Sequence, residues 1–154
     1  MKKNGIKGVV LGISGGIDSA LCAMLAVDAL GAEAVKGVRL PSRFTSDVSL
    51  VGAQRLAEQL VFDLIDLPIE PLFEASLYGD RAWDVTEENL QARARAVLLM
   101  AVANKENRLL ICTSNKAEAA MGYGTLYGDI TGGYAPLIDL FKGDVVALCR
   151  ARNA

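Results

Sequence analysis

Apolar and polar positions along the chain alternate between two periods. Residues 8–13 form an apolar run rich in β-branched side chains, typical of a strand buried on both faces. Residues 17–30 then follow a helical spacing that stops at Gly31, a common helix C-cap. Strands alternating with helices predict an α/β fold, a three-layer sandwich in which a parallel sheet lies between helices. The same alternation predicts strands at 34–40, 62–67 and 109–113, and helices at 47–60, 85–104 and from 115 to 121.

Capping residues and glycines mark the boundaries of these elements. Ser46 precedes the second helix as its expected N-cap, and residues 84–87 have the form of a capping box that opens the long helix. Residues 68–83, which include two prolines, are expected to form a loop before that helix. Residues 122–139 contain five glycines. We expect them to form a lid over the carboxyl ends of the strands, where ligands of such sheets bind.

The composition favours one domain without a large basic surface. The chain has 154 residues, of which 52% are apolar, so we expect a single domain over 1–154. Sixteen basic residues against eighteen acidic ones give a formal charge of -2, which disfavours nucleic acid as a partner. No apolar run reaches the roughly 18 residues of a membrane span, so no membrane partner is expected. Cys22, Cys112 and Cys149 lie far apart in apolar stretches, as expected of core thiols in a reducing cytoplasm.

The chain contains no histidine. A Ser-His-Asp or Cys-His nucleophile is therefore excluded within it, and so are zinc sites built on histidine. The chemistry left open uses carboxylates, lysine, hydroxyls, backbone amides or a hard metal ion.

The turn at residues 14–19 has the composition of an anion-binding loop. It lies between a predicted strand and a predicted helix, so its N–H groups converge at the positive end of the helix dipole. Its two adjacent glycines allow a ligand to approach closely, and Ser14 and Ser19 carry hydroxyl donors. Asp18 would repel a phosphate unless a cation bridged them, which predicts a ligand of Mg²⁺. In the structural alternative, Asp18 only favours the start of the helix.

The sequence Ser-Gly-Gly-Ile-Asp-Ser at 14–19 resembles the pyrophosphate-binding loop of the N-type ATP pyrophosphatases, which adenylate an acceptor and release pyrophosphate. Four further segments resemble the NAD synthetases, most closely the glutamine-dependent type, and together the matches cover almost the entire chain. These segments are 40–47, 88–93, 113–118 and 122–129. The resemblance implies a Rossmann-like fold of the adenine nucleotide alpha-hydrolase type.

The resemblance also implies a reaction. ATP adenylates the nicotinate carboxylate of deamido-NAD, pyrophosphate leaves, and ammonia displaces AMP to give NAD, with ATP and Mg²⁺ as cofactors. The ammonia is supplied free or from glutamine by an upstream glutaminase domain that is not in this chain. The family typically forms homodimers, to which the long helix would contribute, although packing on the sheet explains its apolar positions equally well. The family also continues past the last motif, so we expect the domain to be incomplete at its C-terminal end.

Carried over by position, the resemblance assigns three sets of residues. The ATP-binding residues are Gly12, Ile13, Ser14, Gly15, Gly16, Ile17, Asp18, Ser19, Arg39, Thr113 and Lys142. The deamido-NAD-binding residues are Asn89, Arg93, Glu118, Tyr123, Gly124, Thr125, Leu126 and Asp129. The metal ligands are Asp18 and Glu118, and the catalytic residues are Asp18, Glu118 and Lys142.

Residue spacing supports some of these assignments independently. If the first and fourth strands are neighbours where the strand order reverses, Asp18 and Glu118 flank one crevice. Asn89 and Arg93 lie four residues apart on a helix and share a face suited to gripping the dinucleotide. Arg95 is rotated by about 200° from Arg93 and is expected to point elsewhere.

Several assignments have plain alternatives. On sequence alone Glu118 is also an ordinary solvated helix residue, and Lys142 is also a surface lysine. Tyr123 is expected to stack on the pyridine ring, but exposed glycine-rich loops often carry a half-buried tyrosine. Arg39 and Arg43 follow the second strand, where the base and ribose of the nucleotide are expected.

Two other functions stay open at this point. Another adenylating amidotransferase or ligase, such as GMP synthetase, uses the same phosphate loop. A nucleotide-binding module without catalysis would also have this loop. The helix at Asn89 and the loop at Tyr123 distinguish the NAD synthetases from both.

Overall fold

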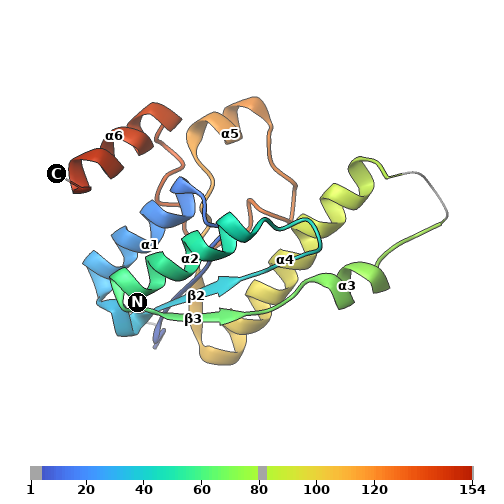
Figure 1. Cartoon of the computed structure of the whole chain (residues 1–154), viewed down its shortest axis with the longest axis horizontal. Helices are drawn as coiled ribbons and strands as arrows, with labels where there is room; N and C mark the ends of the chain where they lie inside the picture. Colours follow the sequence, from blue (N-terminus) through green and yellow to red (C-terminus); the bar gives the residue numbers. More distant parts are fainter. Residues whose placement is uncertain (1–4, 80–82, 154) are drawn as a thin grey trace.

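The computed structural model describes residues 5–79 and 83–153. A parallel sheet with strand order β3-β2-β1-β4 forms its centre, and helices cover the sheet (Figure 1). The α/β fold predicted from the sequence is confirmed. The elements are β1 (Gly8–Gly12), α1 (Ile17–Leu30), the short 3-10 helix η2 (Ala32–Ala34), β2 (Val35–Arg39), α2 (Asp47–Leu60), β3 (Asp63–Asp66), α3 (Glu70–Ala75), α4 (Val85–Glu106), β4 (Arg108–Leu110), α5 (Lys116–Met121) and α6 (Lys142–Asn153).

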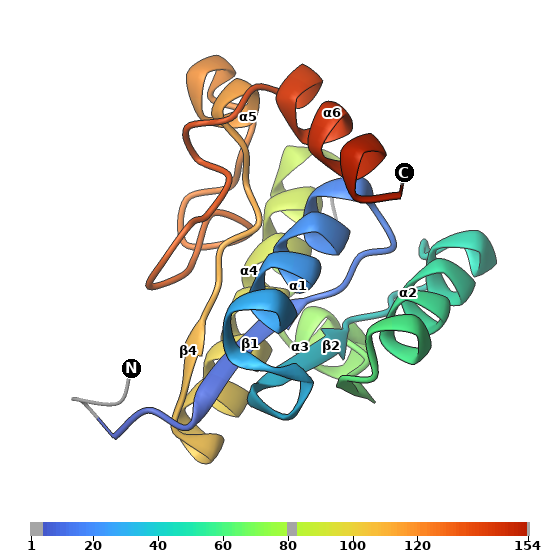
Figure 2. The ribbon, with the colours of Figure 1, turned by 90° about the vertical axis from the view of Figure 1, so that its left-hand side faces the viewer.

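The helices lie on both faces of the sheet. Helices α1 and α2 pack on one face, with α6 against α1, and α4 packs on the other face against β1 and β4 (Figure 2). Side chains alternate accordingly along β1, because Val9 and Leu11 enter the larger core under α1 and Val10 enters the smaller core under α4. Strand β1 is therefore buried on both sides, which explains its continuous apolar sequence.

The direction of strand addition reverses between β1 and β4. The chain adds β2 and then β3 on one side of β1, and after the long helix α4 it adds β4 on the other side. In sheets of this type, the carboxyl ends of the strands at such a reversal form the crevice in which ligands bind. The phosphate-loop candidate follows β1 at this edge, so the topology places it where a ligand site is expected.

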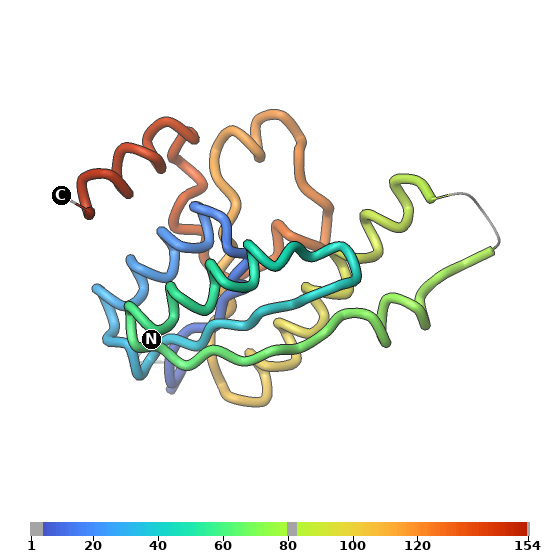
Figure 3. The backbone as a smooth tube through the Cα atoms, viewed as in Figure 1, coloured from blue at the N-terminus to red at the C-terminus, as the bar shows by residue number. Residues whose placement is uncertain are grey.

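Two helices were not predicted from the sequence. Helix α3 lies inside the segment 68–83 that was expected to be a loop. Pro71 occupies its first turn, where the backbone N–H that proline lacks would have no partner within the helix. Helix α6 begins at Lys142. The tube view in Figure 3 shows α6 running beside α1 although the two are far apart in sequence. Of the segment 68–83, residues 80–82 lie outside the described residues.

The glycine-rich segment 122–139 has two different halves. Its second half is anchored to the sheet, because Gly133 donates its N–H to the Leu110 carbonyl at 2.8 Å and Cys112 donates to the Tyr134 carbonyl at 2.9 Å. Leu137 is fully buried in the larger core. The expectation of a lid over the whole segment is therefore wrong for the second half, since that part is held by backbone hydrogen bonds and core packing.

The three cysteines are free thiols, two of them buried and Cys149 half-buried. Burial is the main reason that the pKa of Cys22 rises to about 12, with smaller contributions from Cys112 and Asp18. Cys22 therefore stays protonated and acts as a core side chain. Within 5–79 and 83–153, no helix is long and apolar enough to cross a bilayer.

Replacing Leu137 with alanine tests the anchoring of the late segment. We expect Leu137→Ala to lower the free energy of unfolding by about 2–5 kcal/mol, because it leaves a cavity in the larger core. Ile138→Ala is the matched control, since Ile138 is 40% exposed and should cost much less. Urea unfolding of both variants measures the difference, and equal losses would contradict the anchoring.

Candidate functional site

A cavity of about 480 Å³ opens at the carboxyl ends of the strands. Its walls come from the ends of β1 and β2, from the loop before α2, from one side of α4 and from residues that follow β4. This is a common size for a small-molecule site. Six residues assigned from the sequence to ATP or deamido-NAD line it: Gly12, Ile13, Ser14, Arg39, Thr113 and Asp129.

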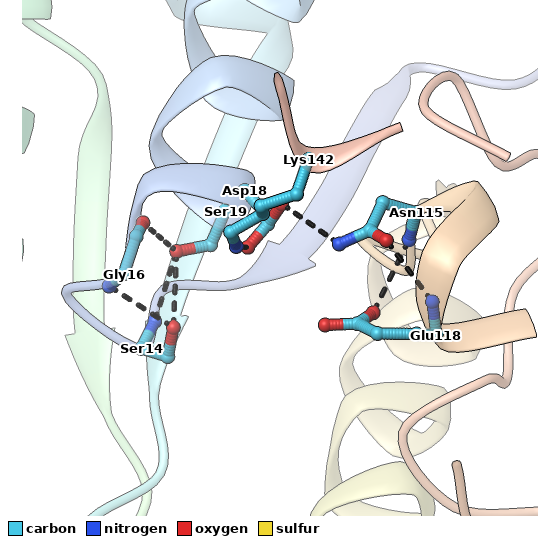
Figure 4. A network of polar contacts seen from close by, with 7 residues as sticks. All are labelled: Ser14, Gly16, Asp18, Ser19, Asn115, Glu118 and Lys142. Carbon is cyan, nitrogen blue, oxygen red and sulfur yellow. Dashed lines mark hydrogen bonds and ion pairs between the residues drawn. The ribbon is translucent and has the colours of Figure 1, made fainter. Parts of the chain in front are cut away.

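The loop between β1 and α1 begins at this cavity and leaves donors free for a ligand. Its residues 14–16 are exposed. Helix α1 has Gly16 as its N-cap and no side-chain hydrogen bond to its first turn, so a ligand can meet the N–H groups there. Ser19 is buried and donates its hydroxyl to the Gly16 carbonyl at 2.9 Å (Figure 4). The Ser14 N–H donates to the Ser19 hydroxyl oxygen at 3.3 Å and the Gly16 N–H donates to the Ser14 hydroxyl oxygen at 3.2 Å, so these two N–H groups stabilise the loop from within. The donors left for a ligand are the first N–H groups of α1, beside the exposed Ser14 side chain.

Asp18 is the centre of a polar cluster that joins three segments (Figure 4). Its Oδ1 accepts a hydrogen bond of 3.1 Å from the side-chain amide of Asn115, and its Oδ2 forms an ion pair with the ammonium group of Lys142. Asn115 is only 1% exposed and caps the N-terminus of α5. Helix α1, the start of α5 and the start of α6 therefore meet at one carboxylate.

Glu118 lies next to this cluster. Its Oε2 accepts a hydrogen bond of 3.2 Å from the backbone N–H of Asn115, while its own N–H donates to the Asn115 side chain at 3.1 Å. Asp18 and Glu118 thus both contact Asn115 and lie on the same side of the sheet, as the strand order implied. Figure 4 shows the Glu118 carboxylate extending from α5 toward the side of the phosphate loop.

These two carboxylates fit Mg²⁺ by their chemistry. Mg²⁺ is usually held by one or two carboxylates together with phosphates of the substrate, so it does not require a cage made only of protein ligands. Across 5–79 and 83–153, no group of three or more His, Cys, Asp or Glu side chains could hold a metal ion. A metal ion here would therefore depend on Asp18, Glu118 and the phosphates of a bound nucleotide.

A second polar surface lies where α4 meets the loop after α5. Thr125 donates its hydroxyl to the Asn89 side-chain oxygen at 2.8 Å, and Arg93 Nε donates to the Leu126 carbonyl at 3.3 Å. Asp129 Oδ1 accepts from the Thr125 N–H at 2.6 Å. Tyr123 is 82% exposed beside them. Seven of the eight residues assigned to deamido-NAD therefore belong to α4 and this loop, and the eighth, Glu118, lies beside the cluster around Asp18. The seven are Asn89, Arg93, Tyr123, Gly124, Thr125, Leu126 and Asp129.

The profile of the NAD synthase family matches residues 1–154. The chain belongs to the NAD synthase family. A glutamine-dependent NAD(+) synthetase of Xanthomonas campestris pv. campestris (strain 8004) is 51% identical over 157 residues, which cover 98% of this chain and 28% of the relative. The match to an NAD synthase profile over the whole chain favours this family over GMP synthetase, the alternative left open by the phosphate loop.

Two solved structures resemble the chain closely. The structure of glutamine-dependent NAD+ synthetase from Acinetobacter baumannii in complex with ADP matches with a TM-score of 0.94 and 44% sequence identity. The match covers 99% of this chain and 30% of the Acinetobacter baumannii chain. NMN synthetase from Francisella tularensis has a TM-score of 0.89 and 34% identity, and the match covers 99% of this chain and 64% of that one. The chain thus spans less than a third of the length of the Xanthomonas campestris and Acinetobacter baumannii relatives.

Two arginines expected near the base and ribose of the nucleotide are engaged with protein carboxylates in this member of the NAD synthase family. Arg39 lines the cavity, but its Nε and Nη2 donate to the Asp66 carboxylate at 2.5 and 2.6 Å. That pair is the main cause that raises the pKa of Arg39 and lowers the pKa of Asp66. Arg43 forms ion pairs with Glu70 and Glu74 of α3 and is not among the residues that line the cavity, so its place beside the nucleotide stays a prediction.

Two residues of the site were missed in the sequence. Asn115 was seen only as the start of a helix, although an amide side chain directly after a strand of such a sheet is a signal for this edge. Arg95 was expected to point away from Arg93, and it does, but it points into the cavity. The spacing of the two arginines on α4 predicted the angle between their side chains. It did not predict which part of the structure each side chain faces.

The phosphate loop depends on Gly15, which adopts φ +80° and lies against the backbone of α2. A Cβ there would lie 2.4 Å from the Ser49 carbonyl oxygen, so we expect Gly15→Ala to destabilise the protein by more than the about 1–2 kcal/mol of left-handed backbone strain. Gly143→Ala is the control, because a Cβ there meets nothing within 4 Å. Thermal unfolding compares them, and an unchanged melting temperature in Gly15→Ala would contradict this packing.

Proposed function

We propose that the protein carrying this chain amidates deamido-NAD to NAD in two steps, through an adenylated carboxylate, with release of pyrophosphate and AMP. The observation that carries the proposal is the contact of Asp18 with Asn115 and Lys142 beside an exposed phosphate loop, whose first residues line a cavity of about 480 Å³. The family membership supports it, and so does the ADP bound by the Acinetobacter baumannii relative.

The chain's own residues suit the adenylation step. The nicotinate carboxylate is ionised at neutral pH and needs no general base, which fits a chain without histidine. The free N–H groups at the start of α1 receive the phosphates, and Thr113, three residues after β4, lines the cavity. Bound Mg²⁺ supplies neutralisation of phosphate charge at Asp18 and Glu118. Lys142 is half-exposed, and a lysine carries its charge on a long flexible side chain. It can therefore leave Asp18 and follow the departing pyrophosphate.

The surface of α4 and the loop after α5 suits the dinucleotide. Arg93 is exposed and keeps N–H groups beyond the one that contacts the Leu126 carbonyl, so it can also bind a phosphate or carboxylate. The exposed ring of Tyr123 offers a face for the pyridine. Asn89 and Asp129 hold Thr125 between them, which fixes the loop that carries this ring.

The remaining parts of the proposal concern the whole protein. Ammonia comes free or from glutamine through a glutaminase domain, as the names of the glutamine-dependent relatives suggest. The residues 1–154 form one domain of the N-type ATP pyrophosphatase kind, and the protein is a cytoplasmic homodimer. Helix α4 supports the dimer, because Val97 is 56% exposed and packing on the sheet does not cover it.

An activity assay tests the proposal. The protein is incubated with ATP, Mg²⁺, ammonium and one of three acceptors, and NAD or its counterpart, AMP and pyrophosphate are measured. We expect stoichiometric AMP and pyrophosphate with deamido-NAD. The deamido form of NMN is the second acceptor, since a similar structure is an NMN synthetase, and xanthosine monophosphate is the third. Preference for either of these two would refute the proposed substrate, and nucleotide binding without pyrophosphate release would refute catalysis.

Substitution of Asp18 separates its catalytic role from a structural one. We expect Asp18→Asn to lower turnover more than about 100-fold, because several kcal/mol of charge stabilisation on the phosphates are lost. Folding should change little, since ion pairs with an exposed partner contribute about 0–1 kcal/mol. Asp28→Asn on the same helix is the control, because Asp28 pairs with Arg152 away from the site. Mg²⁺ should no longer raise the melting temperature of the ATP complex in Asp18→Asn, and full activity in that variant would refute the role.

A further inference from the structure

Helix α4 presents two different faces to the site. Asn89 and Arg93 contact the loop after α5 on one face. The face that lines the cavity carries Ala92, Arg95 and Ala96, and Leu99 one turn later. Three of these four side chains are apolar and two are as small as a methyl group. Arg95 is therefore the one residue through which this face of the helix can bind charge.

The charge of Arg95 is poorly compensated by the protein. Its Nε donates one long hydrogen bond of 3.5 Å to the Leu40 carbonyl, and no carboxylate within the described ranges 5–79 and 83–153 forms an ion pair with it. Arg39, the other arginine of the cavity, is in contrast held by both oxygens of Asp66. Burial lowers the pKa of Arg95, and the charge of Asp129 offsets part of that effect. A guanidinium remains protonated throughout the ordinary pH range, so this cation favours an anionic ligand.

The position of Arg95 indicates which anion fits. The cavity is lined by Gly12, Ile13 and Ser14, the first part of the phosphate loop, and its lining does not include Asp18 or Lys142. The metal and lysine end of the site therefore lies beyond the cavity, and the cavity itself takes the remainder of the nucleotide. The phosphate that joins these two regions is the one attached to the nucleoside.

We propose that Arg95 binds the phosphate that stays with adenosine, in the cavity that the first part of the phosphate loop also lines. This rests on the proposed function, in which that phosphate is attacked and then leaves as AMP. Pyrophosphate departs toward Lys142, whereas Arg95 is fixed on a helix and keeps its contact through both steps. Five N–H donors in a planar fork suit a phosphate with two or three free oxygens. Arg95 thereby retains the adenylate after the pyrophosphate has gone.

Binding of two ligands that differ only by this phosphate tests the proposal. Isothermal titration calorimetry of the protein with AMP and with adenosine is compared for wild type, Arg95→Met and Arg95→Lys. Arg55→Met is the matched control, because Arg55 is exposed on α2 outside the cavity lining. We expect Arg95→Met to weaken AMP at least about tenfold, in the range for a charge-assisted contact, and adenosine less than twofold. Arg95→Lys should recover part of the AMP affinity, and Arg55→Met should change neither.

The outcomes separate this proposal from the proposed function. If Arg95→Met weakens AMP no more than adenosine, Arg95 does not bind the phosphate, whatever the enzyme produces. If AMP binding changes as expected but no NAD forms from deamido-NAD, the proposed function fails and the assignment of Arg95 stands. Circular dichroism establishes that each variant is folded. Should Arg95→Met unfold, the AMP-to-adenosine affinity ratio of Arg95→Lys decides, and a ratio equal to that of wild type with both affinities unchanged would overturn the proposal.

Discussion

The site depends on how one carboxylate is compensated. Asp18 is largely buried at the start of α1, and a buried charge is costly unless polar partners surround it. Its partners are the Asn115 amide and the Lys142 ammonium, which come from segments about 100 and 120 positions away along the chain. Asn115 is held in turn by the capping box with Glu118. The position of each of these side chains therefore depends on the adjacency of β1 and β4, which brings their carboxyl ends to one edge.

That adjacency also divides the site into three regions with different chemistry. The cavity between β2 and α4 has mostly apolar walls and suits a nucleoside. The loop at 14–19 offers N–H groups and hydroxyls, and the cluster around Asp18 offers carboxylates and an ammonium group. Arg95 lines the cavity, whereas Arg93 contacts the loop that carries Tyr123, so the two arginines of α4 face different regions. Under the proposed function, this one helix would help to place both substrates.

Sequence patterns predicted the parts of the structure that depend on local chemistry. The alternation of strands and helices, the N-cap at Ser46 and the turn between β1 and α1 were correct because neighbouring residues determine them. The shared side of Asp18 and Glu118 also followed from a general rule for parallel sheets. The partners of Arg39 and Arg43 did not follow, since Asp66 and Glu70 lie 27 residues further along the chain and no local pattern links them. Arg95 was missed for a related reason, because the cavity that it lines is formed by the end of β2 and by residues 128–131, which are distant from it in the sequence.

The contact between Lys142 and Asp18 has a consequence for how the site changes when it is loaded. In the free chain the ammonium neutralises the carboxylate, so that neither charge is left alone at the end of α1. Under the proposed function, Asp18 would hold Mg²⁺ together with Glu118, and the exposed Lys142 would be free to contact the phosphates instead. The ammonium group would then exchange one anion for another, and the local charge would stay close to balanced in both states. The exposure of Lys142, in contrast to the buried Asn115, is what allows one partner of Asp18 to exchange while the other holds the carboxylate in place.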